Sequence, residues 1–475
     1  MTTVASAGPL RAGAGPNGAT TRELLPWVAG SAGLGILSVE SPLLAAGVGV
    51  TATLAVLPLM ALFAVLVLAT AGEGFSMQVA GMTFRPDMLV ATVFAVRALT
   101  VTPRVRSGAV EAALVAFMAL QVVTSGLHSV DPAASIRSAA MLGFGVLAFF
   151  GVRAALATRD RLLTAVRIAL AVALAAAAAG IALLAASYVI GSTFGVTRLE
   201  TLSGFPAITG FAYEHDVFGS SCAAVAIVFL ALWREANPLL SRQAAAVSFW
   251  ICAGATLLSL ARGAWLGLAA GLLVSWLAGG RRAQPMTGLV LTSAVVIALI
   301  GAGALAFSSQ SVTDVGAGTA SAVSTQAQQA LNLRSSTGAR RLVEWKTSLS
   351  EVRSSLWFGL GTNSYGQRHF ERTISGPKPA FVGNWFVRIL YDSGIVGLFL
   401  FLAFAVPIVW PDAHLRNAEG DLAPIARALT FGCTVLAVSY LATDALLLVW
   451  PWVLLGLTRA ARVLSAEQER GSRSV

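Results

Sequence analysis

The chain has 475 residues, of which 56% are hydrophobic and only 11% are charged, and its mean hydropathy is +0.78. A soluble domain needs far more charged side chains to cover its surface, so this composition excludes a soluble globular protein and predicts an integral membrane protein. The net charge of +10 does not indicate nucleic-acid binding, because most arginines fall in short connectors between apolar segments, where they set membrane orientation.

Apolar segments that predict membrane helices run through the chain. Residues 1–22 precede them and lack the basic start and compact apolar core of a cleaved signal, so we expect a disordered cytoplasmic tail. One apolar segment contains Pro58 and corresponds either to one kinked span or to two short ones. The predicted segments are 25–39, 43–70, 86–102, 109–125, 136–153, 162–190, 218–233, 243–259, 263–278, 287–307, 384–410, 424–442 and 445–461.

Arginine-rich connectors alternate along the chain with connectors poor in arginine and lysine. The positive-inside rule places the arginine-rich set in the cytoplasm, and the segment 308–382 then lies outside. Arg11 and Arg22 favour a cytoplasmic N-terminus and the last tail is also basic, so the number of spans must be even. One of the thirteen predicted segments must then be wrong, and we expect residues 25–70 to hold either three short spans or one span and a re-entrant piece. The sequence thus predicts an all-α polytopic membrane helix bundle of about 12 spans, within a range of 12–14, and one long extracytoplasmic loop.

This topology divides the chain into five parts. They are the tail 1–22, a transmembrane bundle 23–307, the extracytoplasmic loop 308–382 with an amphipathic helix, transmembrane spans in 383–461, and a cytoplasmic tail 462–475. The outer loop carries eight basic and four acidic residues. A long basic loop beside a membrane predicts a binding site for an anion, and a lipid-linked phosphate is the obvious candidate.

A helix beginning near Thr337 is the first candidate for that site. Its apolar residues recur every three or four positions and form one stripe, so the helix should lie on the membrane surface or against the bundle. Arg341 stands four residues before Trp345 on the same face, and a guanidinium there suits phosphate oxygens, with Arg340 in support. The same pattern is also typical of a solvated surface helix.

Two charged residues at or inside predicted spans are candidates for a functional role. Arg262 lies at the outer end of two spans, where a cation faces either a cavity or partner, or reaches the interface along its own stem. Asp392 falls inside a span and therefore needs a partner. The Gly359-Leu360-Gly361 segment ends a helix in a turn and is only weak evidence for a phosphate cradle.

Glu214, His215 and Asp216 form a polar group at an outer boundary. They could supply an acid, a base or a sugar contact, or else only cap the following helix. His369 stands near Arg368 and Arg372, cations that favour its neutral, proton-accepting form, although an exposed surface histidine is the plainer alternative. The three cysteines are scattered and form no Cys-x-x-Cys or Cys/His cluster, so we expect neither a disulfide framework nor a metal site.

The order of these motifs resembles the O-antigen ligase and polymerase superfamily of bacterial envelope glycan enzymes. The resemblance covers about residues 205–405: Ala261-Arg262-Gly263 at a span end, Arg341-x-x-x-Trp345 in the outer loop, Gly359-Leu360-Gly361, and the run from Asn384 to Leu398. It implies a multi-pass protein of the bacterial inner membrane whose active-site loop is extracytoplasmic. It also implies glycan transfer from a polyprenyl-diphosphate carrier to a glycan or lipid acceptor hydroxyl, with no metal and no cofactor.

The resemblance also implies roles for individual residues. Family members bind the diphosphate leaving group with arginines at the Arg262 and Arg341 positions, which is electrostatic transition-state stabilisation. Many ligases carry a histidine just before Asn384 as a candidate base, but this chain has Gly383 there. The candidates for acceptor activation are His369 and Glu214. The candidates for substrate contact are His215, Asn384 and Asp392. The missing histidine weakens a ligase relative to a polymerase.

Two other classes of function fit a chain of this composition. A transporter or flippase of an amphiphilic anion would show internal repeats around a site in the middle of the membrane, but the halves show no repeat and the polar residues gather at the outer face. A scaffold protein of the membrane would not need Arg262 at a span end. We therefore expect a lipid bilayer and a lipid-linked glycan as partners, and no nucleic acid.

Overall fold

The computed structural model describes residues 42–79, 82–102, 108–199, 205–278, 336–373, 376–411 and 413–473. The chain forms two compact units, Met1–Leu57 and Pro58–Val475, and the described part of the first is helix α2 (Pro42–Val56). The predicted tail 1–22, the predicted spans 25–39 and 287–307, and the first part of the outer loop fall outside these described residues.

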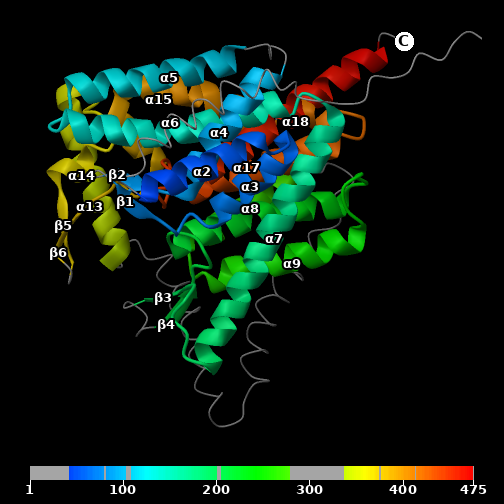
Figure 1. Cartoon of the computed structure of the whole chain (residues 1–475), viewed down its shortest axis with the longest axis horizontal. Helices are drawn as coiled ribbons and strands as arrows, with labels where there is room; N and C mark the ends of the chain where they lie inside the picture. Colours follow the sequence, from blue (N-terminus) through cyan, green and yellow to red (C-terminus); the bar gives the residue numbers. More distant parts are fainter. Residues whose placement is uncertain are drawn as a thin grey trace, which may run out of the picture. The chain divides into compact units, whose positions relative to one another are not determined.

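The second unit is mostly helical, and most of its long helices begin and end within four residues of a predicted apolar segment (Figure 1). Helix α18 (Trp450–Arg473) differs, because it continues past the predicted segment 445–461 into the predicted tail. Pro58 lies between α2 and α3, so the segment 43–70 forms two helices, because proline cannot donate the hydrogen bond of a helix interior. The helices are α3 (Leu59–Ala71), α4 (Pro86–Val101), α5 (Ala109–Leu127), α6 (Pro132–Ala155), α7 (Arg159–Val189), α8 (His215–Arg234), α9 (Arg242–Leu258), α10 (Arg262–Ala278), α13 (Ser336–Glu351), α14 (Tyr365–Arg368), α15 (Trp385–Val409), α16 (Ala413–Asn417), α17 (Ala423–Ser439) and α18 (Trp450–Arg473).

Five of these helices, α5, α6, α7, α8 and α15, are long and apolar enough to cross a membrane. Three shorter apolar helices, α3, α10 and α17, accompany them in the described part of the chain. The membrane character of the chain therefore agrees with its composition, and the count of 12 to 14 spans stays a prediction.

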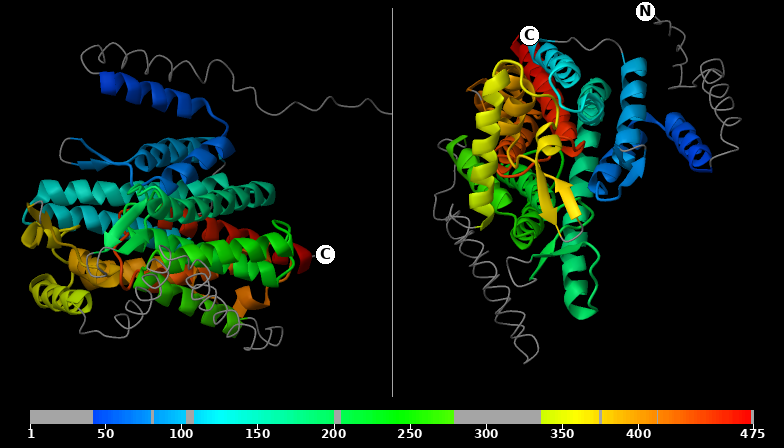
Figure 2. Two further views of the ribbon diagram at one scale, coloured as in Figure 1. Left: turned by 90° about the horizontal axis from the view of Figure 1, so that it is seen from below. Right: turned by 90° about the vertical axis from the view of Figure 1, so that its left-hand side faces the viewer.

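Three short antiparallel hairpins depart from the all-α prediction. They pair β1 (Met77–Val79) with β2 (Met82–Phe84), β3 (Val196–Leu199) with β4 (Phe205–Ile208), and β5 (Phe370–Thr373) with β6 (Gly376–Pro379). All three lie between predicted apolar segments. Backbone groups beside a membrane need hydrogen-bonding partners, and a hairpin supplies them locally. Figure 2 shows β3–β4 against the C-terminal part of the long helix α7.

Helix α8 is the central helix of the second unit. In its most apolar stretch 83% of the residues are buried, against 28% to 50% in the other four long helices. It packs against α9, α10 and α17. Glycines on α10 allow a close approach to α17: a Cβ atom at Gly267 would lie 2.8 Å from the carbonyl oxygen of Val435. Small residues at a helix contact allow the two backbones to pack closely.

Helix α15 is broken near its outer end. Gly394 has a φ of +67°, a left-handed conformation that side chains other than glycine adopt at a cost. The turn after α13 inserts at this break: Ile395 N donates to Leu356 O at 2.9 Å, and Val396 N donates to Trp357 O at 3.2 Å. The break thus anchors the described part of the outer loop to the helices.

Candidate active site

Asp216 and Arg341 form the centre of the candidate site. Helix α8 starts at His215, and Asp216 in its first turn suits the positive end of the helix dipole. Arg341 Nη2 on α13 donates to Asp216 Oδ2 at 3.4 Å, and His215 Nε2 lies 3.4 Å from Asp216 Oδ1. The side chains of Arg341 and Asp216 are 23% and 20% exposed, so a ligand could reach the pair. Glu214 is the residue before the helix, and its side chain makes no capping bond.

Arg262 joins the same centre from a third element. It begins α10 directly after a tight turn, in which Leu260 has a φ of +55°. Its guanidinium is half-buried and close enough to Arg341 and Asp216 to interact electrostatically with both. The structure therefore brings together two arginines that lie far apart in the sequence, beside the carboxylate of Asp216.

A close fit between α8 and the α9–α10 turn positions Arg262. A Cβ atom at Gly219 would lie 2.9 Å from the Cβ of Ala261 and 2.2 Å from Ser259 Oγ, so only glycine allows this approach. Ser259 Oγ in turn accepts a hydrogen bond from Ala261 N at 3.3 Å. The first turn of α8 and the first residue of α10 are thereby held side by side.

Arg340 lies outside this centre. Its Nε is 3.3 Å from Glu344 Oε1, one turn further along α13, and its side chain is 55% exposed. Arg340 and Arg341 therefore face different neighbours although they are adjacent in sequence. A supporting role for Arg340 in phosphate binding stays a prediction.

His369 belongs to a second polar group. Its Nε2 lies 2.8 Å from Glu351 Oε1, while Tyr391 donates to Glu351 Oε2 at 2.6 Å. The imidazole ring also packs on Tyr365, with 4.4 Å between the ring centroids. The charged group in contact with the imidazole is therefore a carboxylate, whereas the sequence pointed only to the cations Arg368 and Arg372.

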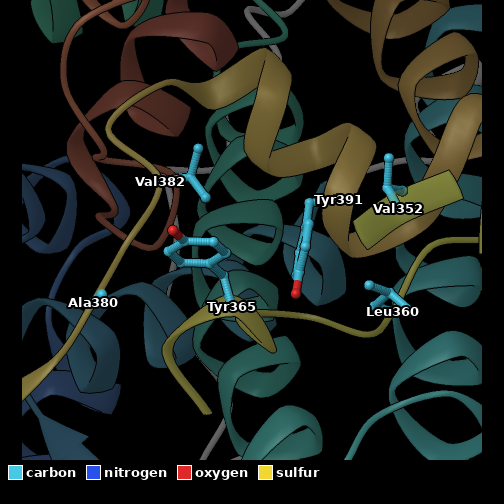
Figure 3. Close-up of a cluster of buried hydrophobic side chains, with 6 residues drawn as sticks. All are labelled: Val352, Leu360, Tyr365, Ala380, Val382 and Tyr391. Carbon is cyan, nitrogen blue, oxygen red and sulfur yellow. The ribbon is translucent and has the colours of Figure 1, made fainter. Parts of the chain in front are cut away.

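An apolar cluster shares Tyr365 and Tyr391 with this second polar group. Figure 3 shows its members, with Tyr365 and Tyr391 at the centre: Val352, Leu360, Tyr365, Ala380, Val382 and Tyr391. Glu351 follows Arg341 by ten residues on α13, which is about 15 Å of helix. The carboxylate that contacts His369 thus comes from a residue about 15 Å along α13 from Arg341.

The comparisons with known proteins address this same region. Residues 247–402 match the family model described as O-antigen ligase. This match confirms the resemblance to the O-antigen ligase and polymerase superfamily. Arg262, Arg341, His369 and Asp392 lie inside the matched segment, whereas Asp216 precedes it. A search of curated proteins finds no match.

Gly383, where many O-antigen ligases carry a histidine, lies beside the arginine centre. A Cβ atom at Gly383 would stand 3.5 Å from Arg341 Nε. A side chain at this position would therefore contact the guanidinium directly. Asn384, the next residue, begins α15: its Oδ1 accepts from Phe386 N and Val387 N, and its Nδ2 donates to Leu441 O at 2.9 Å. The structure thus shows Asn384 as a helix cap, and a contact with substrate stays a prediction.

The turn from Gly359 to Gly361, inside the matched segment, packs against the broken helix α15. Leu360 N donates to Tyr391 O and Gly361 N donates to Asp392 O, both at 2.9 Å. Gly359 has a φ of +75°, and a Cβ atom there would lie 2.4 Å from Ser393 N. Because the turn's N–H groups already have partners, the turn is a packing element of α15 and not a phosphate cradle.

Asp392 has the partner that the sequence required. Arg388, one turn earlier on α15, lies with its Nε 3.4 Å from Asp392 Oδ2, and it also pairs with Asp444. Its Nη2 donates to Asn363 Oδ1 at 3.3 Å. All three charged side chains are nearly fully buried. Arg388 was not predicted to be this partner, although its position four residues before Asp392 on one helix allows the two side chains to meet.

The described ranges of the chain contain no group of three or more His, Cys, Asp or Glu side chains arranged to hold a metal ion. The charges that face one another at the candidate site are those of Arg262, Arg341 and Asp216.

Proposed function

We propose that this protein is a membrane glycosyltransferase of the O-antigen ligase and polymerase superfamily. It moves a glycan from a polyprenyl-diphosphate carrier to an acceptor hydroxyl at the outer face of a bacterial inner membrane. The observation that carries the proposal is the convergence of Arg262 and Arg341 on Asp216, within and next to the family match.

The reaction follows from the charges at this centre. The acceptor oxygen attacks the anomeric carbon of the carrier-linked sugar, the bond from that carbon to the diphosphate oxygen breaks, and the diphosphate leaves with the bonding electrons. Two guanidinium groups that face one carboxylate can stabilise the charge that develops on the leaving group. The diphosphate oxygens would replace Asp216 as the partner of Arg341.

The acceptor hydroxyl must also lose a proton. His369 and Glu214 are the proposed groups for acceptor activation, with His215, Asn384 and Asp392 as proposed sugar contacts. His369 has the geometry of an oriented base, because Glu351 holds one ring nitrogen and leaves the other for a substrate. To act as a base, this nitrogen must come within hydrogen-bonding distance of the acceptor hydroxyl that attacks beside the bound diphosphate.

Replacing His369 with asparagine tests this assignment. We expect transfer to slow by about 100-fold, as for removal of a general base, with a smaller effect on carrier binding. The measurement is the rate of glycan transfer against pH with purified protein and lipid-linked substrate. Glu351→Gln is the matched variant, since it should shift the pH profile without removing the imidazole. A full rate in His369→Asn would remove His369 from the mechanism.

Deletion of the gene tests the function as a whole. Envelope and secreted glycans of the deletion strain would be compared with those of the parent by gel electrophoresis. Single repeat units in place of long chains would identify a polymerase. Long chains that stay on the lipid carrier would identify a ligase. An unchanged glycan pattern would contradict the proposal and favour a transporter of an amphiphilic anion.

A further inference from the structure

A separate pocket lies on the other side of α8 from the arginine centre. Its walls come from α3, α7, α8 and the first residue of α18, and with its open mouth it holds about 510 Å³ of empty space. Helix α8 contributes Phe218, Ser221 and Cys222 to the wall. Phe218 follows Asp216 by two residues, a rotation of about 200° around the helix, so the pocket and Asp216 occupy opposite faces of α8.

Two of the residues that line this mostly apolar pocket carry buried polar atoms without a partner in the described part of the chain. Glu73, in the turn after α3, is 2% exposed, and Trp450 is 8% exposed. Neither Glu73 Oε2 nor Trp450 Nε1 has a hydrogen-bonding partner among the residues that the structure describes. A buried polar group without a partner costs free energy, and such groups usually have a partner in native proteins. A carboxyl group and an indole N–H on one pocket wall therefore point to a ligand that can both donate and accept.

The charge of Glu73 narrows the class of ligand. Burial raises the pKa of Glu73 to about 8, the negative charge of Asp87 adds to this rise, and Arg85 opposes it. Arg85 is already engaged, because its Nε bonds Asp87 at 3.1 Å and its Nη2 bonds Leu447 O at 2.8 Å. A raised pKa favours the neutral carboxyl near pH 7, so Glu73 offers a cation no full negative charge, and a buried carboxylate or phosphate would lose its hydration without a charged partner.

We propose that this pocket binds a membrane-borne long-chain alcohol, whose hydroxyl bonds to Glu73 and Trp450 and whose hydrocarbon lies against the apolar wall. The wall residues of α3 and α7 belong to apolar helices, and α7 is long enough to cross a membrane, so the ligand reaches the pocket from the bilayer. The site is distinct from the one for a diphosphate and does not depend on the proposed glycan transfer.

Photolabelling tests the proposal on the full-length protein in lipid nanodiscs. The probe is a dodecanol analogue with a diazirine next to the hydroxyl carbon, and labelled peptides are mapped by mass spectrometry. We expect label on the peptide that contains Phe218 and Cys222, with excess dodecanol competing and dodecyl phosphate failing to compete. Equal competition by dodecyl phosphate would overturn the proposal, as would label that dodecanol does not displace.

Variants of residues that lie on either side of α8 provide the controls for this experiment. Glu73→Leu removes a hydrogen-bonding group and Ala173→Trp fills the pocket, and each should lower specific labelling by about tenfold. Glu73→Gln keeps a neutral hydrogen-bonding group and should retain labelling. Arg341→Ala, on the opposite side of α8, should also retain it. Each variant is first shown to be folded by its thermal unfolding curve. Unchanged labelling in both Glu73→Leu and Ala173→Trp would refute the site.

Discussion

Replacement of Arg341 by alanine is expected to lower glycan transfer by about 100- to 1,000-fold while the protein stays folded and inserted. Arg341 contributes one of the two guanidiniums that face Asp216, and loss of a single preorganised group that stabilises a developing anion typically has this magnitude. The measurement is the rate of transfer from a purified polyprenyl-diphosphate glycan, together with the affinity for the carrier.

Arg340→Ala is the matched control for this experiment. Arg340 precedes Arg341 by one residue, is 55% exposed and pairs with Glu344, an arrangement of little energetic consequence. We expect its removal to change the rate by less than about threefold. Arg341→Lys adds information, since lysine keeps the charge but loses the two-pronged geometry that suits phosphate oxygens. Normal product from Arg341→Ala would refute the proposed mechanism.

Replacement of Arg388 by methionine is expected to lower the free energy of unfolding by about 3–5 kcal/mol. Arg388 lies buried between Asp392 and Asp444, and removal of one member of a buried ion pair leaves a charge without compensation. The measurement is denaturant or thermal unfolding in detergent, with Arg340→Ala again as control, for which we expect a change of at most about 0.5 kcal/mol.

The same variants separate structural and functional roles for Asp392. The triple replacement Arg388→Met, Asp392→Leu and Asp444→Leu removes the network as a whole and should recover part of the lost stability, because no buried charge then remains without a partner. If this triple variant is stable and also transfers glycan, Asp392 does not bind substrate. If Arg388→Met keeps its stability but loses transfer, the network acts on the substrate instead.

Much of the fold could be predicted from the sequence. Apolar segments of sufficient length specify membrane helices locally, so the helices from α3 to α17 begin and end close to the predicted residues. Arg262 and Arg341 could be identified because a cation at the end of a span, or on the apolar face of a helix, costs free energy unless it has a partner or ligand. The three hairpins were missed because short strands in connectors depend on pairing and carry little periodic signal.

The sequence by itself determined the membrane helix character of this protein and its resemblance to the O-antigen ligase and polymerase superfamily, because hydropathy and motif order are local properties of the chain. Only the tertiary structure decided that Arg341 meets Asp216, 125 residues away, that Gly383 lies beside Arg341, and that Glu73 and Trp450 line one pocket. Contacts of this kind depend on which helix faces pack together, and side-chain packing between distant segments leaves no periodic pattern in the sequence.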